Sequence, residues 1–132
     1  MIINELDKMD VGNKYTSGRK YDKGKLLYSL MPPYAHKEIV DILSYGATKY
    51  DPGNWMIVEN MVYRYSNAAE RHYAAWRMGE TTDPETNKHH IAHAICCLMF
   101  ILEKELIPEE KWSQYIEREL KFCGHPSKDV VL

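Results

Sequence analysis

The chain has 132 residues, of which 45% are hydrophobic and 27% charged, and this fits one globular domain with a modest core. The formal net charge of −2 argues against a general nucleic-acid-binding role, which needs a basic face, whereas a few local cations suffice for one phosphate chain. Three cysteines do not make a disulfide framework, no apolar run is long enough to span a bilayer, and the first ten residues do not resemble a signal peptide, so we expect a cytoplasmic protein with no membrane partner.

The first third of the chain is predicted to contain one helix. Residues 1–18 lack periodicity and are predicted to form a flexible arm, and a basic, glycine-containing loop follows over residues 19–25. Apolar residues then recur at helical spacing after two prolines, which predicts a helix over 33–45 with Gly46 as its stop. Residues 47–60 are predicted to be irregular, because Asp51-Pro52-Gly53-Asn54 is a turn signal.

Three further helices are predicted, over residues 61–78, 88–106 and 108–122. The helix over 88–106 is apolar nearly all round, so we expect it to be the most buried. A short acidic loop joins it to the preceding helix, and the two should form a hairpin. The pattern therefore predicts an all-α fold, a small bundle of about four helices around a central buried hairpin. We divide it into the arm (1–18), a helical domain (19–106), and a C-terminal helix and tail of the same domain (107–132).

Polar side chains are concentrated near the closed end of this hairpin, where carboxylates and imidazoles together suit a divalent cation. His90 and His93 are three apart on a helix and should project from one face, whereas His89 points about 100° away from His90, toward solvent. A structural alternative is that His93 is a core histidine satisfied by a backbone carbonyl. The cluster consists of Glu70, Arg71, His72, Glu80, Asp83, Glu85, His89, His90 and His93.

Cations and aromatic residues elsewhere suit a nucleotide. The Arg71 guanidinium can pair with two phosphate oxygens, and Lys25 and Lys49 could add positive charge. Trp55 could stack on a base while Asn54 reads its edge, although aromatic residues in loops often only fill the core. Each lysine, taken alone, is better explained as a surface residue.

Several short motifs occur in a fixed order, and together they resemble the phage-associated dATP/dGTP diphosphohydrolase N-terminal domain family. The resemblance covers about residues 19–106. The motifs are Lys20-Tyr21-Asp22-x-Gly24-Lys25, Gly46-Ala47-x-Lys49-Tyr50, Asn54-Trp55, Arg71-His72, Gly79-Glu80-x-x-Asp83-Pro84-Glu85-Thr86 and His90-x-x-His93-Ala94.

The resemblance implies an all-α domain that binds a purine deoxynucleoside triphosphate with a divalent metal and hydrolyses it to monophosphate and pyrophosphate. The chain is more distantly similar to MazG-like all-α pyrophosphohydrolases, which hold Mg²⁺ with acidic residues on two neighbouring helices. In this chain Glu80-x-x-Asp83 is predicted to lie in a loop, and the helix that follows it carries His90-x-x-His93 instead of an acidic pair.

Our first hypothesis is a metal-dependent nucleoside triphosphate pyrophosphohydrolase that uses Mg²⁺ or Mn²⁺. We assign catalysis to Glu80 and Asp83, one of which would orient the water. The expected metal ligands are Glu70, Glu80, Asp83, His90 and His93. The expected nucleotide-binding residues are Lys25, Lys49, Tyr50, Asn54, Trp55, Arg71 and His72.

Two alternatives stay open: a phage protein that captures a nucleotide or cyclic-nucleotide signal without cutting it, and a helical interaction protein with structural histidines. Under any hypothesis we expect a homo-oligomer, because three helices can cover only part of the surface of a fourth helix that is apolar nearly all round.

Overall fold

A computed structural model describes residues 17–126 of the chain; residues 17–30 belong to one compact unit and residues 31–126 to a second. The described part of the first unit contains a turn, in which Lys25 N donates to Asp22 O at 3.1 Å, and the short 3-10 helix η1 (Tyr28–Leu30). Most of the predicted arm, residues 1–16, and the end of the predicted tail, residues 127–132, lie outside the described residues.

The second unit is all-α, as predicted. Apart from one isolated bridge between Thr82 and His89, no β-pairing occurs within residues 17–126. No helix in this described range is long and apolar enough to cross a membrane. Its elements are α2 (Pro33–Tyr50), the 3-10 helix η2 (Asn54–Ile57), α3 (Met61–Arg77), α4 (His90–Leu106), the 3-10 helix η3 (Glu109–Lys111) and α5 (Trp112–Phe122).

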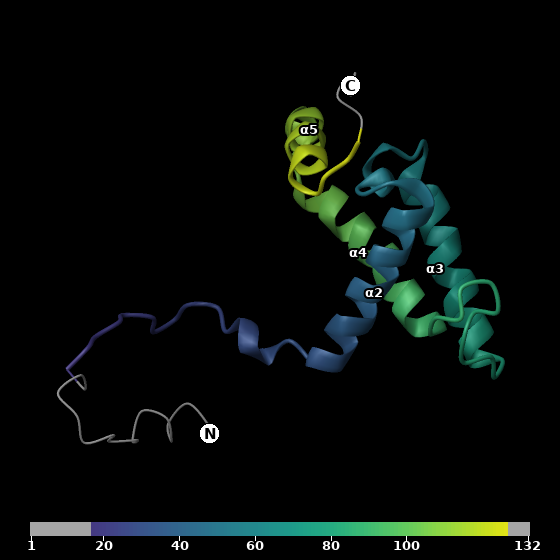
Figure 1. Ribbon diagram of the computed structural model, residues 1–132, viewed down its shortest axis with the longest axis horizontal. Helices are drawn as coiled ribbons and strands as arrows, with labels where there is room; N and C mark the ends of the chain where they lie inside the picture. Colours follow the sequence, from purple (N-terminus) through teal and green to yellow (C-terminus); the bar gives the residue numbers. More distant parts are fainter. Residues whose placement is uncertain (1–16, 127–132) are drawn as a thin grey trace. The chain divides into compact units, whose positions relative to one another are not determined.

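Helices α3 and α4 form the predicted hairpin and lie side by side, with α2 packed across α4 (Figure 1). Gly79 ends α3 at φ 101°, a left-handed conformation that glycine adopts without steric cost. The amide of Gly79 donates to Trp76 O and that of Glu80 to Ala75 O, both at 3.0 Å. These bonds direct the chain into a polar loop over residues 78–89, which we call the hairpin loop.

Two apolar clusters hold the unit together. One joins α2 to α4 through Ile42, Ala92 and Cys96, and the other joins η2 to α5 through Met56, Ile116 and Leu120. The cluster of Ile42, Ala92 and Cys96 positions α2 along one side of the hairpin.

Two expectations about these helices are wrong. Helix α2 passes through Gly46 and continues to Tyr50, because one glycine costs a helix interior only about 1 kcal/mol; the chain leaves the helix instead at Asp51-Pro52. Helix α4 begins at His90 rather than at residue 88, and His89 is its N-cap, with Nδ1 accepting from Ile91 N at 3.0 Å.

Helix α4 contains more buried residues than any other described helix, as expected. Its inner face is buried, but the side chains of Leu98 and Leu102 on its outer face are 55% and 58% exposed. The described residues of the single chain therefore do not cover α4 on all sides.

Candidate functional site

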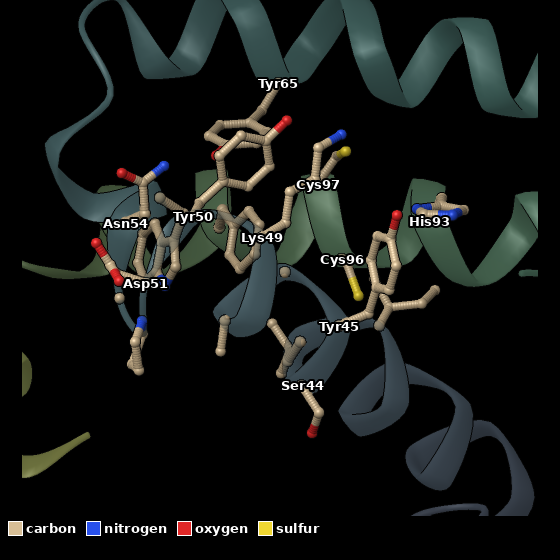
Figure 2. Close-up of a pocket in the computed structure, with 18 of the residues that line it drawn as sticks. Ser44, Tyr45, Lys49, Tyr50, Asp51, Asn54, Tyr65, His93, Cys96 and Cys97 are labelled. Carbon is tan, nitrogen blue, oxygen red and sulfur yellow. The ribbon is translucent and has the colours of Figure 1, made fainter. Parts of the chain in front are cut away.

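A cavity of about 620 Å³ opens between α2, η2, α3, α4 and the hairpin loop. Its volume lies in the range of small-molecule sites. Figure 2 shows Asn54, Tyr50 and Tyr65 gathered at one end and His93 at the other. The cavity therefore has an aromatic end and an end rich in ionisable groups.

The aromatic end is built on Phe100 of α4. The ring of Trp55 stacks on Phe100 with centroids 4.6 Å apart, and Tyr65 meets Phe100 edge-on at 5.0 Å. Trp55 also packs against Trp112 at 6.3 Å. Trp55 thus fills the core, as the structural alternative held, and still lines the cavity. Flat apolar walls of this kind suit a nucleobase.

The other end contains His93, Thr86 and Asp83. Thr86 Oγ1 lies 2.7 Å from His93 Nε2 and 3.4 Å from Asp83 Oδ2, so this hydroxyl links the imidazole to the carboxylate. Asp83 also accepts from Glu85 N at 3.1 Å, which shapes the hairpin loop. The loop thereby presents a carboxylate and an imidazole to the cavity.

A second chain of polar groups runs beside the first. His90 Nε2 lies 2.6 Å from Glu80 Oε1, and His90 Nδ1 lies 2.9 Å from His72 Nδ1. The ring of His72 stacks on that of His93, with centroids 4.4 Å apart and planes 8° from parallel. His72 and His93 line the cavity, whereas Glu80 and His90 do not.

Two ion pairs join α2 to the hairpin. Lys49 Nζ lies 3.1 Å from Glu85 Oε1, and Lys88 Nζ lies 2.7 Å from Asp41 Oδ2. The hydrogen bond from Lys88 lowers the pKa of Asp41, while Tyr50 and Glu85 raise the pKa of Lys49. Lys49 therefore keeps its positive charge at the wall of the cavity.

Burial keeps several other groups neutral. Desolvation, together with neighbouring His93, lowers the pKa of His72 to about 4, and desolvation lowers the pKa of His93 as well. Burial also raises the pKa of Cys96 to about 12 and that of Cys97 to about 11. The imidazoles at the cavity are thus lone-pair donors rather than cations, and both thiols are inert.

The structure gathers some of the predicted site residues and leaves others apart. Glu80 and His90 are hydrogen-bonded to each other and do not line the cavity, Glu70 and Arg71 are exposed on α3 and do not line it, and Lys25 belongs to the first unit. The predicted residues that line the cavity are Lys49, Tyr50, Asn54, Trp55, His72, Asp83 and His93.

Several residues of the cavity wall were missed. Tyr45 and Tyr65 both line it, and Thr86 joins Asp83 to His93. Tyr45 could have been found, because it shares a helical stripe with Asp41. The contact of Thr86 could not, since it depends on how the hairpin loop folds.

Within residues 17–126, no group of three or more His, Cys, Asp or Glu side chains is arranged to hold a metal ion. Glu80 is instead hydrogen-bonded to His90, His93 to Thr86, and Glu85 to Lys49. A protein-only metal cage is therefore not formed by these residues in this arrangement.

Comparisons with known proteins identify one family. The model of the family described as dATP/dGTP diphosphohydrolase, N-terminal, matches residues 15–114. A dATP/dGTP diphosphohydrolase of Salmonella phage PMBT28 is 33% identical over 119 residues, an alignment that covers 86% of this chain and 40% of that relative. The chain thus spans less than half the length of the relative. No solved structure matches it.

Proposed function

Because the chain belongs to the dATP/dGTP diphosphohydrolase N-terminal family, we propose that it hydrolyses a purine deoxynucleoside triphosphate to the monophosphate and pyrophosphate. The observation that carries the proposal is the two-ended cavity. Its aromatic end accepts a base, and its other end offers a lysine, two carboxylates and two neutral imidazoles for the triphosphate. The net charge of −2 supports a small anionic substrate over a nucleic-acid polymer.

The base would lie against the aromatic wall at Trp55 and Tyr65, where Asn54 can hydrogen-bond its edge. Lys49 would exchange its bond to Glu85 for one to a phosphate, since both are anionic oxygens. This arrangement would position the α-phosphorus near the histidine end. In phosphoryl transfer, most of the catalysis comes from such positioning.

We propose that the activity depends on Mg²⁺ or Mn²⁺. Mg²⁺ in nucleotide sites is held by one or two carboxylates together with substrate phosphates, so it does not require a protein-only cage. Asp83 and Glu85 both line the cavity and fit this pattern. A bound cation would neutralise the charge of the triphosphate. The exposed Glu70 is a weaker candidate ligand, and so is His90, whose two ring nitrogens are already hydrogen-bonded.

The test is to incubate the full chain with each of the four deoxynucleoside triphosphates and either Mg²⁺ or Mn²⁺. We expect pyrophosphate and the matching monophosphate from dATP or dGTP, and none in the presence of a chelator. The variant Asp83→Asn should lose the activity, whereas Glu105→Gln, at an exposed carboxylate of α4 outside the cavity, should retain it. No pyrophosphate from any nucleotide at high enzyme concentration would refute the proposal.

A second candidate is capture of a nucleotide, or of a cyclic-nucleotide signal, without hydrolysis. Two observations favour it: the described residues form no protein-only metal cluster, and the chain aligns with only 40% of its phage relative. Recovery of an intact nucleotide from denatured protein, or stoichiometric binding in the presence of a chelator, would support capture. Rapid turnover of the bound nucleotide would exclude it.

We also propose that the chain forms a homo-oligomer and, given its phage relative, acts in the host cytoplasm. Ile95, Leu98 and Leu102 follow one another at helical spacing on the outer face of α4 and are exposed in the single chain. A contiguous apolar stripe of this kind is typical of an interface, and a second copy that presents the same stripe would cover it.

A further inference from the structure

Two neighbouring polar side chains line the aromatic end of the cavity. Asp51 and Asn54 lie at the end where Tyr50 and Tyr65 gather (Figure 2). A turn holds the two residues together, since Asn54 N donates to Asp51 O at 3.3 Å. Within residues 17–126, neither the Asp51 carboxylate nor the Asn54 side-chain amide makes a hydrogen bond or an ion pair. Both groups can therefore bind a ligand without first giving up a partner in this part of the chain.

The backbone of Asp51 is strained. Asp51 follows the last residue of α2 with φ 90° and ψ 146°, close to a region that essentially only glycine occupies without cost. Pro52 favours an extended ψ at the residue before it, but it does not require a positive φ. A glycine would make the same turn with less strain, and strained residues are concentrated at ligand-binding sites. The strain, the unpaired carboxylate and its place in the cavity together point to a role in binding.

The two purines differ in the hydrogen-bonding groups along one edge. Guanine offers two adjacent donors, N1–H and N2–H₂, next to the acceptor O6, whereas adenine offers the donor N6–H₂ next to N1, which is an acceptor. A carboxylate can only accept, and its two oxygens can take both guanine donors at once. Opposite adenine N1, the same carboxylate would meet a lone pair and lose its solvation without a compensating bond. A carboxylate at this end of the cavity therefore favours guanine.

We propose that Asp51 is a specificity-determining residue that selects guanine over adenine by accepting from N1–H and N2–H₂, while the Asn54 amide donates to O6. The inference rests on the proposed function and deepens it, because it names dGTP as the preferred purine substrate. A bidentate contact of this kind discriminates between bases by about 10- to 100-fold. The strain at Asp51 is then a cost in stability that is offset by selectivity.

Equilibrium binding tests the selection without requiring hydrolysis. The ligands are the α,β-methylene analogues of dGTP and dATP, whose bridge between the α- and β-phosphorus cannot be hydrolysed, and calorimetry on the full chain in Mg²⁺ measures Kd. We expect the wild type to bind the guanine analogue about 10- to 100-fold more tightly. Asp51→Asn should bring the two Kd values close together, because an amide can donate to adenine N1 and accept from N6–H₂. Glu105→Gln, outside the cavity, should keep the wild-type ratio. Equal Kd values in the wild type, or a wild-type ratio in Asp51→Asn, would overturn the inference.

A second variant separates a role in binding from a role in folding. Glycine adopts a φ of 90° without strain, so Asp51→Gly should raise the urea midpoint of unfolding and at the same time abolish the preference for guanine. A residue that served only the turn would not change the ratio of the two Kd values. An Asp51→Gly chain that still prefers guanine, or that is less stable than the wild type, would overturn the inference.

Hydrolysis distinguishes this inference from the proposed function. In the wild type, kcat/KM for dGTP should exceed that for dATP by about 10- to 100-fold, and dITP, which lacks N2–H₂, should be a poorer substrate than dGTP. Equal kcat/KM values for dGTP and dATP would leave the proposed function intact and overturn the selection by Asp51. If no nucleotide were hydrolysed but the guanine analogue were still bound selectively, the proposed function would fail and the selection would stand.

Discussion

Lys49 Nζ and Glu85 Oε1 lie 3.1 Å apart, and this pair joins the last turn of α2 to the hairpin loop across the cavity. The two residues are 36 positions apart in the sequence. Both side chains are exposed to solvent, so the pair adds little to stability; under the proposed function, it holds a cation beside the phosphate chain.

Lys49→Ala should therefore weaken nucleotide binding far more than folding. We expect Kd for a deoxynucleoside triphosphate to rise about tenfold, in line with the loss of one charge-assisted hydrogen bond. Isothermal titration calorimetry in Mg²⁺ would measure it. Lys37→Ala, a lysine on the same helix outside the cavity, is the control. Equal affinities for the two variants would show that Lys49 does not contact the phosphates.

Gly53 and Gly46 should respond to alanine in opposite directions. A Cβ on Gly53 would lie 2.6 Å from Leu120 Cδ2 and 2.9 Å from Met56 Cε, and Gly53 has a φ of 77°. Gly53→Ala should cost about 2 kcal/mol of unfolding free energy or more. At Gly46, inside α2, a Cβ meets nothing within 4 Å, so Gly46→Ala should stabilise the chain by about 0.5–1 kcal/mol.

Urea unfolding of both glycine variants and of the wild type would measure these effects. A Gly53→Ala chain as stable as the wild type would mean that the η2 loop is free to move away from α5. That result would contradict the close packing of Gly53 against Leu120, whose side chain is only 1% exposed.

Stability should fall on mild acidification. The folded pKa of His72 is about 4, below the value of 6.5 expected when the chain unfolds, so the unfolded state binds more protons between these pH values. The stabilisation is complete above about pH 6.5 and is lost as the pH falls toward 4, on the order of 2 kcal/mol in total. The lowered pKa of His93 acts in the same direction.

Urea midpoints between pH 7 and pH 5 would follow this loss. His72→Gln should flatten the dependence, because Gln does not titrate, whereas His36→Gln, at an exposed position on α2, should leave it unchanged. A wild-type chain whose stability rises from pH 7 to pH 5 would contradict the neutral, partly buried state of His72.

Charge on the outer face of α4 should separate the proposed oligomer. Leu98→Glu combined with Leu102→Glu places two like charges on the exposed apolar stripe. We expect multi-angle light scattering to report an oligomer for the wild type and a monomer of unchanged helical content for the variant. Phe122→Glu, at an 87% exposed position near the end of α5, is the control. A monomeric wild type would refute the proposal.

The sequence by itself determined the helices and their partnership. The helical spacing of apolar residues predicted α3, α4 and the hairpin that they form, since these features depend on residues close together in the chain. The same spacing put His90 and His93 on one helix, near Asp83. The ordered motifs also pointed to the family, which the match over residues 15–114 confirmed.

Only the tertiary structure decided which of those groups face a cavity and which ring nitrogens are hydrogen-bonded. His72 on α3 contacts His90 on α4. Lys49, which contacts Glu85, lies in the last turn of α2, and the sequence pattern did not predict that turn. Such contacts depend on side-chain rotamers and on the packing of distant segments, which local periodicity does not encode. The extent of burial of α4 depends on packing in the same way: within residues 17–126 its inner face is buried, whereas Leu98 and Leu102 on its outer face are exposed.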